Sequence, residues 1–264
     1  MNFIFSRIVN ALCLVAALAV VSGCGSSSTV DPFKPTRVIG LGDAYNDTSL
    51  VNQATVRGTT ETITTVVAQM AALYGAPTVL SYASSSYATT ADLMAQITQL
   101  GNLSETQDLI VITAGTKEFL SGNDTTGTNF LGNLKLALDA LRSKGATHIV
   151  IMTVIDISPA GVYADPLSFN MTVSGGLQGY VDVVRYGNIN RPSAYFPGWA
   201  SSTTGTGATP YCNNPQNLDG CSLGETPGTA DVATYFLADN LNPTPAGNQW
   251  LGSQLYTGTG GGWR

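Results

Sequence analysis

The sequence predicts a single α/β domain of three layers, in which helices cover both faces of a mostly parallel, doubly wound sheet. Two observations support this prediction. Short apolar runs typical of buried strands alternate along the chain with longer stretches of helical apolar spacing. Residues 108–113 are apolar at every inner position, as expected for a strand covered on both faces. Strands separated by helices pair in parallel, because each helix returns the chain to the end of the sheet at which the previous strand began.

Four strands and three helices are expected in order along the chain. The predicted strands are 37–41, 78–82, 108–113 and 148–155, and the predicted helices are 61–74, 90–100 and 130–144. Gly75 and Pro77 end the first helix, and Gly145 ends the third. Ligands in such sheets bind at the carboxyl ends of the strands, so the loops that follow the strands are the place to look for a site.

The first 35 residues are interpreted as an export signal and a tether. Arg7 precedes the apolar run 8–21. That run is shorter than the ~20 residues that a bilayer core requires, so it predicts a cleaved signal peptide over 1–23. The polar segment 24–35 is typical of a flexible tether. We therefore predict the folded domain over 36–257 and a Gly-rich tail over 258–264.

The end of the signal segment, Val21-Ser22-Gly23-Cys24, resembles a bacterial lipobox. This resemblance implies that Cys24 carries acyl chains such as palmitate, and two or more chains are needed for stable membrane attachment. Gly25 stands where an Asp would favour retention in the inner membrane, so the outer membrane is the expected location. The alternative is ordinary signal cleavage, which would release a soluble protein.

Charge and composition restrict the classes of partner. The chain has 17 acidic and 11 basic residues, and loss of Arg7 with the signal would change the formal charge from −6 to −7 (10 minus 17). No basic run is present, so nucleic-acid binding has no electrostatic support. Only 11% of the residues are charged, which is typical of an exported protein with a neutral surface.

Two of the four cysteines are expected to pair. Cys13 would leave with the signal, and Cys24 is the lipidation site, which leaves Cys212 and Cys221 in a Gly- and Asn-rich loop. In an oxidising compartment this pair predicts a disulfide, worth about 2–3 kcal/mol through loop closure. A metal site is the alternative, but no second cysteine pair and no neighbouring His supports it.

Four blocks of sequence, in order, resemble those of the SGNH/GDSL lipase and esterase family. The first block contains Gly42-Asp43-Ala44, where the family has Gly-Asp-Ser. The resembling segments are 38–48, 81–90, 112–118 and 238–247, and 168–177, 192–195 and the loop of Cys212 and Cys221 resemble the phospholipase/lecithinase-type branch. The resemblance covers nearly the whole mature chain. It implies a flavodoxin-like, SGNH-type arrangement of the predicted sheet.

At the positions that this family uses for chemistry, the chain carries other residues. Ala44 stands at the position of the nucleophilic Ser and Asn242 at that of the general-base His, while Ser86 and Lys117 stand at oxyanion-hole positions. Asp239, the acid that orients the base, is retained. The resemblance therefore implies a non-catalytic module that binds an acyl, glycan or peptide ligand, or a partner, in the cell envelope without a cofactor.

An active ester hydrolase with a rearranged site is the alternative. Ser84, Ser85 or Ser86 would act as nucleophile with Lys117 as base, a pair that works when burial lowers the Lys pKa. Against this, Lys117 is expected to form an ion pair with Glu118, Asp43 or Asp239, which would hold it protonated.

Two further readings of the polar residues are weaker. His148, the only His in the chain, opens the fourth predicted strand and so lies at the opposite end of the sheet from the expected site. The acids Asp43, Asp47, Glu118 and Asp239 would suit calcium or magnesium. Lys117 among them would repel a cation, so no metal is expected.

Overall fold

The computed structural model describes residues 33–48, 65–84, 87–152, 154–155, 166–187, 236 and 243–258, all within one compact unit, Phe33–Trp263. Several predictions fall outside these residues: the signal peptide, most of the tether and the tail, Cys24, and the pair Cys212 and Cys221. Ser86, Asp239 and Asn242 also lie outside them. Within the described ranges, no helix has the length and apolar character needed to span a bilayer.

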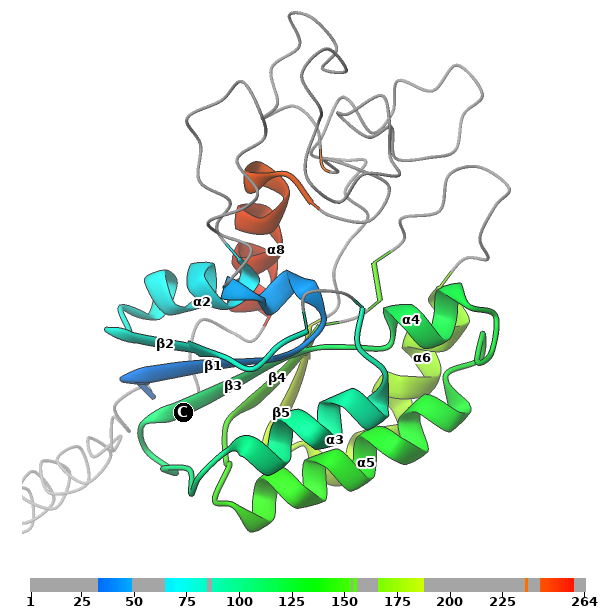
Figure 1. The fold of residues 1–264 in the computed structure, drawn as a ribbon, viewed down its shortest axis with the longest axis horizontal. Helices are drawn as coiled ribbons and strands as arrows, with labels where there is room; N and C mark the ends of the chain where they lie inside the picture. The colour runs from blue at the N-terminus through cyan, green and yellow to red at the C-terminus, as the bar shows by residue number, and fades with distance from the viewer. Residues whose placement is uncertain are drawn as a thin grey trace, which may run out of the picture. The chain divides into compact units, whose positions relative to one another are not determined.

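The sheet contains five parallel strands in this part of the chain, in the order β2-β1-β3-β4-β5 (Figure 1). The strands are β1 (Arg37–Gly42), β2 (Thr78–Ser81), β3 (Asp108–Thr113), β4 (Ile149–Met152) and β5 (Val184–Gly187). The chain moves from β1 outward to β2 and then crosses back to β3, so the direction of winding reverses between β1 and β3. This is the flavodoxin-like order of a doubly wound sheet, and the predicted fold class is confirmed.

Helices cover both faces of this sheet. Helices α2 (Val66–Tyr74) and α8 (Pro245–Gly258) lie on one face, and α3 (Thr90–Gln99), α5 (Thr128–Ser143) and α6 (Leu167–Gly176) lie on the other (Figure 1). The short helix α4 (Thr116–Leu120) and the 3-10 turns η1 (Ala44–Asn46) and η3 (Gln178–Tyr180) complete the described elements. The three layers are those that the alternation of strands and helices predicts.

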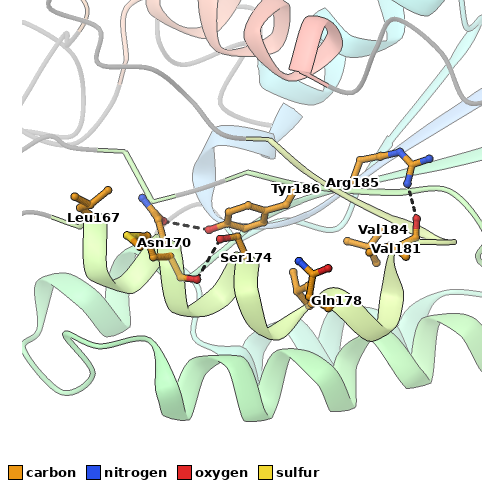
Figure 2. A pocket seen from close by; sticks show the side chains of 10 residues that line it. Leu167, Asn170, Ser174, Gln178, Val181, Val184, Arg185 and Tyr186 are labelled. Carbon is orange, nitrogen blue, oxygen red and sulfur yellow. Dashed lines mark hydrogen bonds between the residues drawn. The ribbon is translucent and has the colours of Figure 1, made fainter.

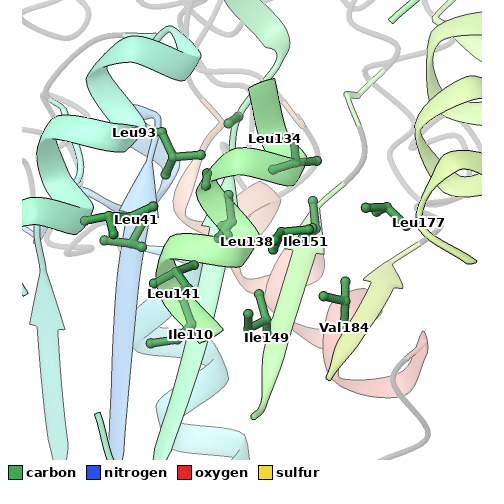
Figure 3. Packing of buried hydrophobic residues seen from close by; sticks show 14 of the residues in the cluster. Leu41, Leu93, Ile110, Leu134, Leu138, Leu141, Ile149, Ile151, Leu177 and Val184 are labelled. Atoms are coloured by element: carbon green, nitrogen blue, oxygen red, sulfur yellow. The ribbon is translucent and has the colours of Figure 1, made fainter. Parts of the chain in front are cut away.

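Two apolar cores result from the pleat of the central strands, in which successive side chains point to opposite faces. Ile110, Ile149 and Ile151 pack with Leu134 and other side chains of α3 and α5 (Figure 3). On the other face, the alternate residues of the same strands pack against α2 and α8; they include Val38, Leu109, Val111 and Val150. Because β3 is buried at all six positions, its unbroken apolar sequence matches its central place.

The predicted fourth strand, 148–155, is too long. β4 ends at Met152. The side chain of Asn170 on α6 forms hydrogen bonds with both the backbone N–H and the carbonyl of Val154. Its Oδ1 accepts from the Val154 N–H at 2.9 Å and its Nδ2 donates to the Val154 carbonyl at 2.8 Å. These groups are therefore engaged by an amide side chain instead of a neighbouring strand.

Two helix starts are explained by side chains that accept backbone N–H groups. Thr89 and Asp92 form a capping box at the start of α3. Asp124 accepts from the N–H of Thr128 at 3.2 Å and from that of Phe130 at 2.7 Å, so α5 begins two residues before its predicted start.

Candidate active site

The candidate site lies where β1 and β3 end. These neighbouring strands run in register to Gly42 and Thr113, and the winding of the sheet reverses between them. In doubly wound folds, ligands bind outside the carboxyl ends of the strands at such a switch point. Asp43 and Ala44 follow β1, and Gly115 follows β3. The sheet order thus brings the first and third resembling blocks side by side.

Gly42 allows the chain to leave β1 in direct contact with β3. Its φ is +96°, and a Cβ atom there would lie 1.8 Å from the backbone oxygen of Thr113. That oxygen instead accepts the N–H of Asp43 at 2.6 Å. The side chain of Gln96 on α3 accepts from the Gly42 N–H at 2.6 Å and donates to its carbonyl at 3.2 Å. The backbone at the end of β1 is therefore held from two sides.

Asn46 fixes the turn that follows. Its side chain is fully buried, and its Nδ2 donates to the carbonyls of Leu41 at 3.0 Å and Val111 at 2.9 Å. The hydroxyl of Ser81, at the end of β2, donates to the Asn46 carbonyl at 2.6 Å. One residue of η1 thus joins the ends of three strands. Neither Asn46 nor Gln96 could be singled out from the sequence, because a lone amide side chain gives no local sign of such contacts.

Ala44 begins η1 and is 9% exposed. It is the first residue after the buried Asp43, at the position that the resemblance assigns to the nucleophile. Its methyl side chain has no atom that can attack an ester or donate a hydrogen bond. The surrounding turn is tightly positioned, yet the residue at its start carries no reactive group.

Asp43 is completely buried beside Ala44. The N–H of Ala88 donates to its Oδ1, while its Oδ2 has no hydrogen-bond partner among the described residues. Burial raises the pKa of Asp43 well above its ordinary value. The hydrogen bonds from Ala88 and Thr116 and the charge of Lys117 act in the opposite direction. A carboxyl group in this setting favours its neutral form.

Glu118 on α4 also binds the segment that leads into α3, two residues further along the chain than Asp43 does. Its Oε1 accepts the N–H of Thr90 at 2.9 Å, and its Oε2 is buried with no hydrogen bond inside the described ranges. Together, Asp43 and Glu118 bind the backbone of residues 88–90, which lead into α3. The segment 88–90 is therefore anchored by one acid that follows β1 and one on α4.

Lys117 does not join these acids. Its side chain is exposed, whereas Thr116 and Phe119 on either side face the interior. The described residues form two ion pairs, Arg37–Asp108 and Arg142–Asp182, and neither includes Lys117. The expected ion pair with Asp43 or Glu118 is thus wrong, because α4 turns Lys117 toward solvent.

The serines of the Ser–Lys alternative are only partly placed. The Ser84 N–H donates to the Gly42 carbonyl at 2.8 Å, which sets Ser84 beside the end of β1. Ser85 and Ser86 lie outside the described residues.

No three acids, histidines or cysteines gather as metal ligands in the described part of the chain. Of the four acids considered as cation ligands, Asp43 and Glu118 each accept a hydrogen bond from a backbone N–H through one carboxylate oxygen. Asp239 lies outside the described residues.

His148 lies at the other end of the sheet. It immediately precedes β4, and its ring stacks on Phe33 with centroids 3.6 Å apart and an interplanar angle of 1°. Its Nδ1 is 2.9 Å from the hydroxyl of Thr147. Burial lowers the His148 pKa, so the ring favours its neutral form. Its predicted position at the amino end of the strand is confirmed, and it cannot act as a base beside Ala44.

The fourth resembling block ends in the cap of α8. Thr244 is fully buried and precedes the helix, and its hydroxyl accepts the N–H of Gly247 at 3.0 Å. Its own N–H donates to the carbonyl of Phe236 at 2.8 Å. Gly247 is required because a Cβ atom there would lie 2.4 Å from that same carbonyl oxygen. The Pro-Thr-x-x-Gly part of the block thus has a structural role at this helix.

Comparison with known proteins gives likenesses at low sequence identity. No protein-family model matches the chain, and no curated protein matches it. The structure is similar to phospholipase A1 from Streptomyces albidoflavus NA297, at 16% identity over 86% of this chain and 99% of that one, with a TM-score of 0.49. A member of the lipolytic protein G-D-S-L family from Veillonella parvula is 13% identical over 83% of this chain and 94% of that one, with a TM-score of 0.48. A putative GDSL-like lipase from Parabacteroides merdae is 12% identical over 88% and 98%, with a TM-score of 0.49. The fold class itself rests on the sheet order and the three layers.

Proposed function

We propose that this protein is an SGNH/GDSL-like pseudo-hydrolase, a lipid-anchored module of the bacterial envelope that binds a ligand or partner and lacks ester hydrolase chemistry. The observation that carries the proposal is Ala44. It stands directly after the buried Asp43 at the switch point of the sheet, where a side chain with a nucleophile would be presented to a ligand.

The composition of the whole chain supports the loss of chemistry. A Ser–His mechanism requires an imidazole, and the single His of the sequence lies at the amino end of β4. Loss of either the nucleophile or the base in a serine hydrolase costs roughly 10⁶ in turnover. Ala44 and Asn242 stand where the family has the nucleophilic Ser and the general-base His. The usual reaction is therefore expected to be absent.

The preserved scaffold supports a binding role. Gln96 and Asn46 hold the loops around Ala44 with buried hydrogen bonds, and Glu118 does so with a partly buried one. These contacts keep the ends of β1, β2 and β3 and the loop into α3 in one arrangement. We expect this surface to take an acyl, glycan or peptide ligand. Cys24 would tether the domain to the outer membrane, and the Cys212–Cys221 disulfide would stabilise it outside the cytoplasm.

The test compares hydrolysis with probe labelling. The purified chain is incubated with p-nitrophenyl acetate and butyrate and, separately, with a fluorophosphonate probe. We expect no turnover above the uncatalysed rate and no labelling. The Ser–Lys alternative is tested with the variants Ser86→Ala and Lys117→Ala, with Lys135→Ala on α5 as a matched control for loss of a lysine. Activity that disappears in Ser86→Ala or Lys117→Ala and persists in Lys135→Ala would overturn the proposal.

A further inference from the structure

Asp43 and Glu118 each keep one carboxyl oxygen buried and unbonded beside the candidate site. Oδ2 of Asp43 and Oε2 of Glu118 have no hydrogen-bond partner among the described residues, although their other oxygens accept backbone N–H groups. Most buried polar atoms in native proteins are hydrogen-bonded, so each exception requires an explanation. Asn46 and Asn248 also have a buried, unbonded Oδ1, but an amide does not take up a proton. The two acids differ from them because a carboxyl oxygen can bind one.

Another polar cluster of the fold shows the ordinary arrangement. In the groove between α6 and β5, the hydroxyl of Tyr186 donates to Oδ1 of Asn170 at 3.2 Å (Figure 2). The same oxygen accepts the Val154 N–H, and Nδ2 of Asn170 donates to the Val154 carbonyl. Both ends of this neutral amide are thus bonded, whereas Asp43 and Glu118 each leave free an oxygen that can carry charge.

Both acids hold the same short segment of backbone, 88–90. Asp43, which follows β1, accepts the N–H of Ala88, and Glu118 on α4 accepts the N–H of Thr90. The N–H between these two bonds within the capping box of α3 itself. In the described hydrogen bonds, the N–H groups of this segment therefore reach the rest of the domain through the two acids. Because Asp43 directly precedes the nucleophile position, the segment borders the candidate site.

The surroundings of Asp43 favour a bound proton. Burial raises its pKa well above the ordinary value, and the charge of Glu118 acts in the same direction. The hydrogen bonds that Asp43 accepts and the charge of Lys117 lower its pKa, but burial is the largest cause. The other titratable groups of the described elements packed there are Tyr45 and Asp47 at η1, Tyr87 before α3 and Asp92 on α3. Loss of the proton would place two negative charges close together where little water can screen them, which is costly.

We propose that Asp43 and Glu118 act as a proton-operated latch, which holds segment 88–90 at the end of β1 while the pair carries a proton and releases it when that proton passes to solvent. Ionisation makes burial of the two carboxyls unfavourable, and movement of 88–90 would let water reach them. The latch would thus set the shape of the surface beside Ala44 according to pH. This inference concerns the regulation of the candidate site and does not depend on whether the site is catalytic.

The test measures hydrogen–deuterium exchange of the full chain at a series of pH values, with each rate corrected for the intrinsic pH dependence of amide exchange. The peptide that spans 88–90 is compared with that of β3, which reports unfolding of the whole domain. Asp43→Asn keeps an oxygen acceptor but cannot ionise, and Glu118→Gln removes the neighbouring charge in the same way. Asp139→Asn on α5 is the matched control, because Asp139 accepts the Tyr180 hydroxyl outside the site.

The protection of 88–90 should fall by up to about tenfold for each pH unit above about 3.9, where a released Asp43 ionises, and should level off above the folded pKa. This fall should vanish in Asp43→Asn, end at a lower pH in Glu118→Gln and stay unchanged in Asp139→Asn. No fall in the wild type, a fall that persists in Asp43→Asn or one that β3 shares would overturn the proposal, as would a fall that Asp239→Asn removes. If Asp43→Asn fails to protect β3, Glu118→Gln decides, and a fall that ends at the wild-type pH would then overturn the proposal.

Discussion

Replacement of Gly42 by Ala should destabilise the fold more than any other single methyl added at a described glycine. The new Cβ would lie 1.8 Å from the Thr113 carbonyl oxygen, so the two strand ends must separate. The positive φ costs an Ala residue about 1–2 kcal/mol. Separation would weaken the hydrogen bond from Asp43 and the two with Gln96, at about 0.5–1.5 kcal/mol each. The sum, about 2.5–6.5 kcal/mol, is a large part of a typical domain stability of about 5–15 kcal/mol.

Two matched variants separate the causes. Gly75→Ala also has a positive φ, +67°, but nothing lies within 4 Å of its Cβ position, so it should cost only the positive φ itself, about 1–2 kcal/mol. Gly132→Ala, in α5 with open space around it, should stabilise by about 0.5–1 kcal/mol. Urea unfolding of the three variants and the wild type, followed by circular dichroism, gives the free energies. A loss in Gly42→Ala no larger than in Gly75→Ala would refute the contact with Thr113 as the cause.

Three further predictions concern the same site. Asn46→Ala should lower the free energy of unfolding by about 2–4 kcal/mol in the same assay, because two buried carbonyls lose their donor; a loss below that of Gly75→Ala would contradict the bridging role. The raised pKa of Asp43 means that its folded form binds a proton more readily than its unfolded form. Its contribution to stability is therefore complete below the unfolded pKa of about 3.9 and is lost as pH rises through the folded value. Asp43→Asn should remove this part of the pH dependence of unfolding, and an unchanged slope would show that Asp43 titrates normally. Ala44→Ser should remain unlabelled by a fluorophosphonate probe, since no His stands nearby to take the proton; strong labelling would show that another base serves the site.

The parts of the fold that sequence reasoning located are those with a continuous or periodic apolar pattern. Strands β1 and β3 match their predicted ranges closely, and the predicted helix 90–100 matches α3 to within one residue. β5 was missed because Arg185 and Tyr186 interrupt its short apolar run. α6 was missed because only Phe169 and Val173 of its residues are buried, which leaves a weak periodic signal. Local patterns identify elements that bury a whole face and fail for elements at the edge of the sheet.

The candidate site likewise contains residues that the sequence identified and partners that only the structure revealed. The sequence motif located Asp43 and Ala44, and the chain topology then placed them at the switch point. Gln96 and Asn46 were missed as partners of the site, and the hydrogen bond of Glu118 to the backbone of Thr90 was not predicted, because a motif describes neighbours in sequence. The bond from Gly42 to Gln96 spans 54 residues and that from Asn46 to Val111 spans 65. No local pattern could reveal such pairs. The ion pair predicted between Lys117 and Asp43 or Glu118 was wrong for the same reason, since the direction of the Lys117 side chain depends on how α4 leaves β3. The third predicted partner, Asp239, lies outside the described residues.

The amino-acid sequence alone determined which chemical groups this protein carries. The chain has one His, and Ala44 stands at the position that the resemblance assigns to the nucleophile. Only the tertiary structure decided how that unreactive residue is held and what surrounds it. The sheet order brings β1 beside β3, and contacts across long stretches of chain then bury Asp43 and anchor the loop into α3. Chemical groups are fixed by covalent composition, whereas their burial and partners depend on packing between segments that are distant in the sequence.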